Sequence, residues 1–146
     1  MDTEIRIERV LPATIERVYD AWTRAELLVR WYCPNPRLEL KVRADVRRGG
    51  SYVVEMGPHV VRGTYLEVEP PTRLVFSWQW DGAGDEPTRV EVELTEVPDG
   101  TRMRLSHTGF ADAEDAANHR MGWEPELDRL VDLLGVRQPG PAAGRR

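Results

Sequence analysis

The sequence predicts an α+β domain in which a curved antiparallel sheet packs against one long C-terminal helix. Segments of the first three quarters of the chain alternate apolar and polar residues with period two, which is typical of half-buried strands. Turn-forming residues, such as Gly49-Gly50 and Pro98-Asp99-Gly100, separate successive segments and favour hairpins. After Asp112 the apolar residues recur at helical spacing, and this helix must bury its apolar stripe against the sheet.

The N-terminal part is predicted to form one strand and two short helices. Residues 3–10 alternate with period two, and the side chains expected to face inward are Ile5, Ile7 and Val10. Thr14 is suited to cap a helix that runs to about residue 23. A second short helix is expected over residues 25–31.

About six consecutive strands and the long helix are expected to follow. The strands are predicted near residues 38–44, 52–56, 60–69, 74–80, 90–95 and 102–107. The helical stripe consists of Trp123, Leu127, Leu130, Val131 and Leu134, and Gly135 is a natural stop. Pro125 costs a helix interior ~3 kcal/mol, which leaves open where the regular helix begins. Residues 1–137 are expected to form one domain, and residues 138–146 a disordered tail.

Composition argues against several classes of protein. The net charge of -5, with arginines scattered among acidic residues, disfavours a nucleic-acid partner. Lys41 is the only lysine, and no apolar run reaches the ~18–20 residues that a membrane span needs. Cys33 is the only cysteine and residues 1–10 have no signal-peptide core, so a cytoplasmic protein is expected. A homodimer is left open.

The sequence contains no recognised cofactor or metal motif. His59, His107, His119 and Cys33 have no spacing known from metal sites, and no metal or cofactor is expected. Cys33 lacks a local base, which favours a structural role. His107 is in phase with Met103 and should point inward, where a structural role is the simpler interpretation. The alternative is that His107 acts as a general base or as an anchor for a ligand.

Tryptophan is over-represented, with five Trp against two Phe. Trp78 and Trp80 lie two residues apart on one strand, so together with Phe76 they form an aromatic row on one face. This row either fills the core or lines a pocket for an apolar or aromatic ligand. The residues expected to line such a pocket are Tyr52, Met56, Phe76, Trp78, Trp80, Met103, His107 and Trp123.

From about Thr3 to Leu134 the chain resembles the START-like, Bet v-type superfamily, also called SRPBCC. Within it, the chain is most similar to the branch named after the activator of the heat-shock chaperone ATPase. Many relatives carry adjacent tryptophans where this chain has Trp31-Tyr32. The matching stretches are Pro12-Ala13, Val18-Tyr19, Ala21-Trp22-Thr23, Glu26-Leu27, Trp31, Asp45-Val46-Arg47, Gly49-Gly50, Leu66-Glu67-Val68, Pro70-Pro71, Arg73-Leu74, Trp78, Leu105 to His107, Gly109-Phe110, Gly122-Trp123, Leu127 and Leu130.

The resemblance implies a helix-grip fold with a cavity between the long helix and the sheet. Members include carriers of apolar small molecules, polyketide cyclases and the chaperone activator, and the fold alone does not choose among them. Our first hypothesis is a binding protein for an apolar small molecule. The second is a cyclase- or hydrolase-like enzyme that uses His107, with Tyr52 as a possible helper. The third is a chaperone-ATPase helper, ranked lowest because the namesake has an additional N-terminal domain.

Overall fold

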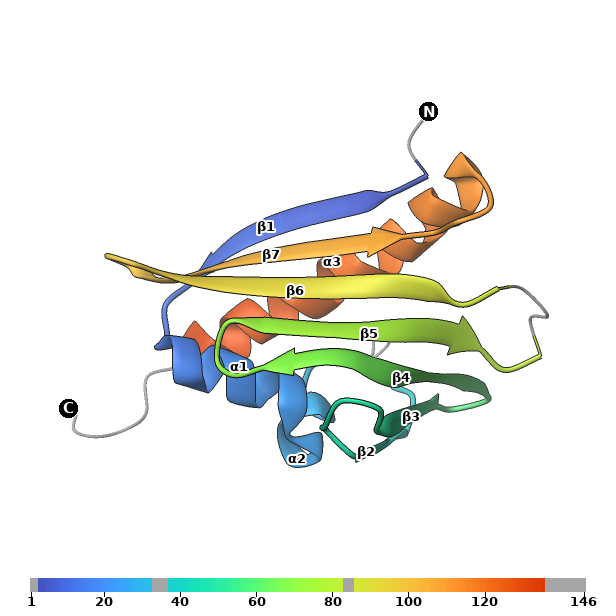
Figure 1. The fold of residues 1–146 in the computed structure, drawn as a ribbon, viewed down its shortest axis with the longest axis horizontal. Helices are drawn as coiled ribbons and strands as arrows, with labels where there is room; N and C mark the ends of the chain where they lie inside the picture. The colour runs from blue at the N-terminus through green and yellow to red at the C-terminus, as the bar shows by residue number, and fades with distance from the viewer. Residues whose placement is uncertain (1–2, 33–36, 83–85, 136–146) are drawn as a thin grey trace.

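The structure, a computed structural model, describes residues 3–32, 37–82 and 86–135, and it confirms the predicted helix-grip fold. A seven-stranded antiparallel sheet, in the order β1-β7-β6-β5-β4-β3-β2, lies against the long helix α3 (Figure 1). The elements are β1 (Ile5–Leu11), α1 (Ile15–Thr23), α2 (Ala25–Leu28), β2 (Leu40–Ala44), β3 (Ser51–Met56), β4 (His59–Glu69), β5 (Arg73–Trp80), β6 (Thr88–Val97), β7 (Gly100–Thr108) and α3 (Ala113–Gly135). Cys33 and the predicted tail at 138–146 lie outside the described residues.

The first strand differs from the prediction at its end. Val10 is 48% exposed, and Leu11 is fully buried instead. The alternation continues through Arg9, whose guanidinium lies 3.8 Å from the Asp128 carboxylate of α3. Val10 was therefore assigned to the wrong face, because strict period two from Ile5 places residue 11, not residue 10, toward the helix.

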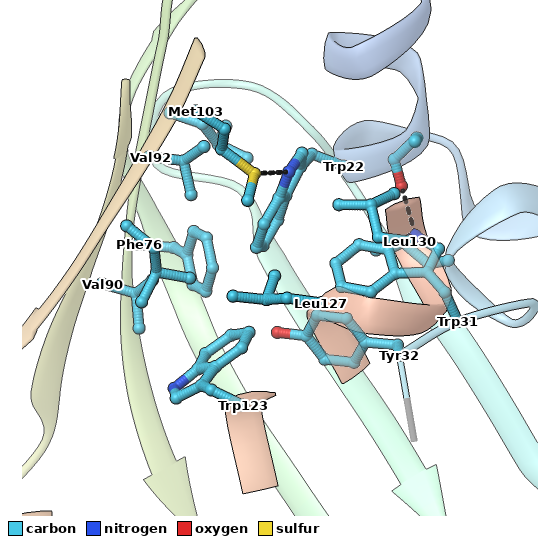
Figure 2. Close-up of a cluster of buried hydrophobic side chains, with 14 of the residues drawn as sticks. Trp22, Trp31, Tyr32, Phe76, Val90, Val92, Met103, Trp123, Leu127 and Leu130 are labelled. Atoms are coloured by element: carbon cyan, nitrogen blue, oxygen red, sulfur yellow. Dashed lines mark hydrogen bonds between the residues drawn. The ribbon is translucent and has the colours of Figure 1, made fainter. Parts of the chain in front are cut away.

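Helix α1 and the turn that follows α2 place aromatic rings at one end of the space between the sheet and α3 (Figure 2). Trp22 and Trp31 meet edge to face, with ring centroids 4.7 Å apart. Both indole N–H groups are buried and satisfied: Trp22 donates to the Met103 sulfur at 3.3 Å, and Trp31 donates to the Ala21 carbonyl at 3.0 Å. The second helix ends at Leu28, earlier than predicted, but Trp31 keeps its buried position.

Helix α3 is continuous through Pro125. At its start the Asp112 carboxylate accepts a hydrogen bond from the Asp115 N–H at 2.8 Å, as expected for a capping residue. Pro125 and Met121 are both exposed, so water can solvate the carbonyl that the proline leaves without a backbone donor. The helix therefore tolerates the proline. None of the described helices has the length and apolar character that crossing a membrane requires.

The opposite face of the sheet is charged. Arg73 lies at the centre of a group of carboxylates, 3.1 Å from Glu67 and 2.8 Å from Glu93. Exposed ion pairs of this kind contribute little to stability, but they keep this face hydrated. The apolar face toward α3 is therefore the place to search for a ligand site.

Gly63 on β4 allows three strands to approach one another closely. It is opposite Tyr52 of β3, whose hydroxyl donates to the Ser77 carbonyl of β5 at 2.6 Å. A Cβ atom at position 63 would collide with that carbonyl and would lie 2.7 Å from the Tyr52 ring. Because the carbonyl belongs to the backbone of a neighbouring strand, it cannot move without disturbing the sheet.

Gly63→Ala should lower the free energy of unfolding by roughly 2 kcal/mol or more, because overpacking a strand interior forces the backbone to shift. Urea denaturation measures this loss. Gly122→Ala in α3 is the matched control: an added Cβ there meets nothing within 4 Å, and alanine is the better helix former by about 1 kcal/mol. Equal stability of Gly63→Ala and the wild type would contradict the close approach.

Candidate ligand-binding site

A cavity of about 250 Å³ lies between the sheet and α3, at the end opposite α1 and α2. Its lining residues come from the segment before β2, the ends of β3 and β5, the start of β4 and the part of α3 up to Glu126. Figure 1 shows where these elements lie. Its lining is mostly apolar and aromatic. The lining residues are Leu38, Met56, His59, Trp78, Trp80, Asn118, His119, Gly122, Trp123 and Glu126.

Three tryptophans form much of the wall. The Trp78 ring centroid is 5.7 Å from that of Trp80 and 5.2 Å from that of Trp123. Trp80 is half-buried, and its N–H donates to Nε2 of His119 at 2.9 Å. His119 Nδ1 in turn lies 2.9 Å from the Asp115 carbonyl, so two contacts hold the outer part of the wall in place. The indoles thus enclose the cavity without filling it.

His107 is fully buried behind this wall and supports it. Its Nδ1 accepts a hydrogen bond from the Trp123 N–H at 3.0 Å, which places the ring proton on Nε2. Nε2 is 2.7 Å from the Thr88 hydroxyl and donates to it. Burial lowers the pKa of His107 to about 3, so the imidazole stays neutral. Both ring nitrogens are therefore used within the protein.

Glu126 is the most deeply buried of the polar lining residues that were not predicted from the sequence, the others being His59, Asn118 and His119. Its side chain is 5% exposed, and its Oε1 has no hydrogen-bond partner among the described residues. Burial raises the pKa of this carboxyl well above its usual value, and the nearby Arg129 opposes the shift only in part. Helical spacing could have identified Glu126 as facing the sheet, because position 126 falls three residues after Trp123 and lies within the apolar stripe.

The structure separates the predicted pocket residues into two groups. Met56, Trp78, Trp80 and Trp123 line the cavity. The other four do not: Tyr52 and Phe76 line a void of only about 10 Å³ nearer α1, Met103 contacts Trp22, and His107 lies behind the wall. In the described ranges, no group of three or more His, Cys, Asp or Glu side chains is arranged to hold a metal ion.

A long helix held against a curved antiparallel sheet, with an apolar cavity between them, defines a START-like, SRPBCC helix-grip domain. Comparison with known families gives the finer assignment. The chain belongs to the family described as Activator of Hsp90 ATPase homolog 1-like protein, whose model matches residues 12–135. No curated protein matches the sequence significantly.

Solved structures show the same fold. Protein CV1439 from Chromobacterium violaceum is 29% identical, with a TM-score of 0.83 over 94% of this chain and 100% of that one. CalU16 from Micromonospora echinospora is 28% identical, with a TM-score of 0.73 over 91% of this chain and 76% of that one. PFC0360w, an HSP90 activator from Plasmodium falciparum, is 21% identical over 92% of this chain and 97% of that one, with a TM-score of 0.77. The last likeness concerns the fold alone.

His107→Gln should lower the free energy of unfolding at pH 7.5 by about 2 kcal/mol, because the Trp123 and Thr88 contacts are lost or distorted. The difference should shrink below pH 6.5. Below pH 6.5 His107 binds a proton in the unfolded wild type but not in the folded protein. The free energy of unfolding of the wild type therefore falls by about 1.4 kcal/mol per pH unit until the folded pKa of about 3 is reached. Urea denaturation from pH 7.5 to 5 measures both effects. A stability difference between the wild type and His107→Gln that is constant with pH would show that the folded imidazole is protonated normally. His59→Gln, at an exposed histidine, is the control.

Glu126→Gln should stabilise the protein at neutral pH. Burial raises the pKa of the folded carboxyl, so the unfolded carboxyl, which ionises above about pH 4.5, loses its proton first. The free energy of unfolding of the wild type therefore falls by up to about 1.4 kcal/mol per pH unit from there to the raised folded pKa. Unfolding at pH 5 and pH 7 should therefore show a gain that grows with pH. Glu124→Gln, at a 47% exposed residue 3.4 Å from Arg120, is the control and should show no such growth. A variant less stable than the wild type at pH 7 would mean that Glu126 is charged and paired.

Proposed function

We propose that the protein binds an apolar or aromatic small molecule in the cavity between the sheet and α3. The observation that carries the proposal is an apolar cavity of about 250 Å³ walled by Trp78, Trp80 and Trp123. An engineered cavity of about 150 Å³ is known to hold benzene, so this volume suits a molecule of about two fused rings. Concave, mostly apolar sites with few polar groups are the usual form of small-molecule sites.

The fixed orientation of the walls supports the same conclusion. His107 holds Trp123 by its N–H, and His119 holds Trp80 in the same way. Side chains that are already ordered lose little entropy when a ligand binds, so the site is organised before the ligand enters.

The alternative functions have weaker support. An acid–base role for His107 needs a ring nitrogen within reach of a substrate, whereas both nitrogens contact Trp123 and Thr88. The HSP90 activator PFC0360w is only 21% identical to this chain, so that likeness supports the fold and adds no support for a chaperone-ATPase role.

Gly122→Leu is expected to block the cavity. Gly122 lines it, and an added Cβ meets nothing within 4 Å, so the leucine side chain can occupy the space without a backbone clash. Isothermal titration with 2-naphthylmethanol should show at least tenfold weaker binding than to the wild type. Stability should be kept, because leucine is a better helix former than glycine.

Ala117→Leu places the same leucine side chain at an exposed position of α3 and should leave binding unchanged. Equal binding by Gly122→Leu and the wild type would place the site elsewhere, and absence of binding to the wild type would argue against an apolar ligand of this size.

A further inference from the structure

The polar content of the cavity identifies a ligand chemistry more specific than "apolar", on the premise that the proposed function is correct. Glu126 is the acidic side chain in the lining, and it is almost completely buried. A buried carboxyl with an unpartnered oxygen is costly to the fold, and a ligand that supplies a hydrogen-bond donor would remove that cost. The site therefore calls for a hydrogen-bond donor on the ligand.

The chain's own cation does not meet this need. Arg129 follows Glu126 by three residues on α3, but its Nε and Nη2 atoms are also buried without a hydrogen-bond partner among the described residues. No ion pair within 4 Å joins the two side chains in this part of the structure. The carboxyl thus has no ion-pair partner within 4 Å among the described residues; its Oε1 is covered in the free protein, so a ligand group would reach it by a small shift of the Glu126 side chain.

The aromatic wall favours a donor that carries positive charge. The faces of indole rings are electron-rich, and tryptophan is the strongest partner for a cation among the aromatic side chains. Trp78 and Trp123 border the same cavity as Glu126, with their ring centroids 5.2 Å apart. An anionic ligand would meet both the ring faces and the carboxyl unfavourably.

We propose that the cavity binds an apolar molecule bearing one amino group, with the ammonium paired to Glu126 and the apolar part packed against the indole rings. In the free protein burial favours the protonated, neutral form of this carboxyl. An amine that is already protonated in water therefore releases one proton when it binds: the carboxyl O–H bond breaks, the proton passes to the buffer, and an ammonium–carboxylate pair remains.

Other titratable groups border or influence the site, and the experiment must separate them from Glu126. His119 of α3 and His59 of β4 also line the cavity. Arg129 and Tyr32 each interact electrostatically with Glu126. His119 accepts the Trp80 N–H through Nε2, so its protonation would break a wall contact rather than assist an amine. Only a change at Glu126 removes the proposed pairing.

The test compares 2-naphthylmethylamine with 2-naphthylmethanol, which have the same ring system and nearly the same size. Isothermal titration at pH 7.5, in two buffers of different ionisation enthalpy, gives both the affinity and the number of protons released. We expect the amine to bind at least tenfold tighter than the alcohol, with release of up to one proton. Glu126→Gln should bring the two affinities together and abolish proton release, whereas Glu124→Gln should change neither.

The remaining outcomes overturn the proposal in distinguishable ways. If the wild type binds both probes equally, or prefers the alcohol, the cavity binds apolar molecules but the amine proposal fails. If the preference for the amine persists in Glu126→Gln, the cation is recognised elsewhere and the assignment of Glu126 is wrong. If neither probe binds, the proposed function fails together with the ligand chemistry.

Discussion

The hydrogen bond between the Trp123 N–H and His107 Nδ1 is the contact on which the cavity end of the molecule depends. A buried indole N–H needs an acceptor, and the imidazole of β7 supplies one in the middle of an apolar interface. Since Nε2 of the same ring contacts Thr88 of β6, one side chain connects α3 to two adjacent strands. This connection sets where the helix rests on the sheet and which side of Trp123 faces open space.

The same layer of side chains is closed at one end and hollow at the other. Near α1 and α2, Trp22 contacts Trp31 on one side and Met103 of the sheet on the other (Figure 2). Only a void of about 10 Å³ remains there. Beyond Trp123 no comparable helix covers the sheet among the described residues, and about 250 Å³ is left unfilled. The positions of α1 and α2 therefore determine which aromatic side chains pack in the core and which line the cavity.

Much of the fold could be predicted from the sequence, because strand and helix periods are local properties of the chain. Val10 was assigned to the wrong face, because a shift of one residue along a strand moves a side chain to the other face of the sheet. Helix α2 was predicted too long, because apolar residues keep helical spacing in the turns after Leu28. For the candidate site, alternation identifies Phe76 and Trp78 equally as inward-facing, yet one lies at the void and the other at the cavity. That difference depends on the tertiary position of α1 and α2. Glu126 was overlooked because a single acidic residue in an apolar stripe resembles a boundary residue.

Gly122 and Pro125 both lie in the turn of α3 that covers the cavity, next to Trp123 and Glu126. Glycine and proline are the two weakest helix formers, at a cost of about 1 and 3 kcal/mol in a helix interior. Both residues lower the intrinsic helix propensity of this turn, which is held on the sheet by the buried side chains of Trp123 and Leu127. The cavity is already partly open to solvent, so a ligand has a route into it that does not require this helical turn to unfold.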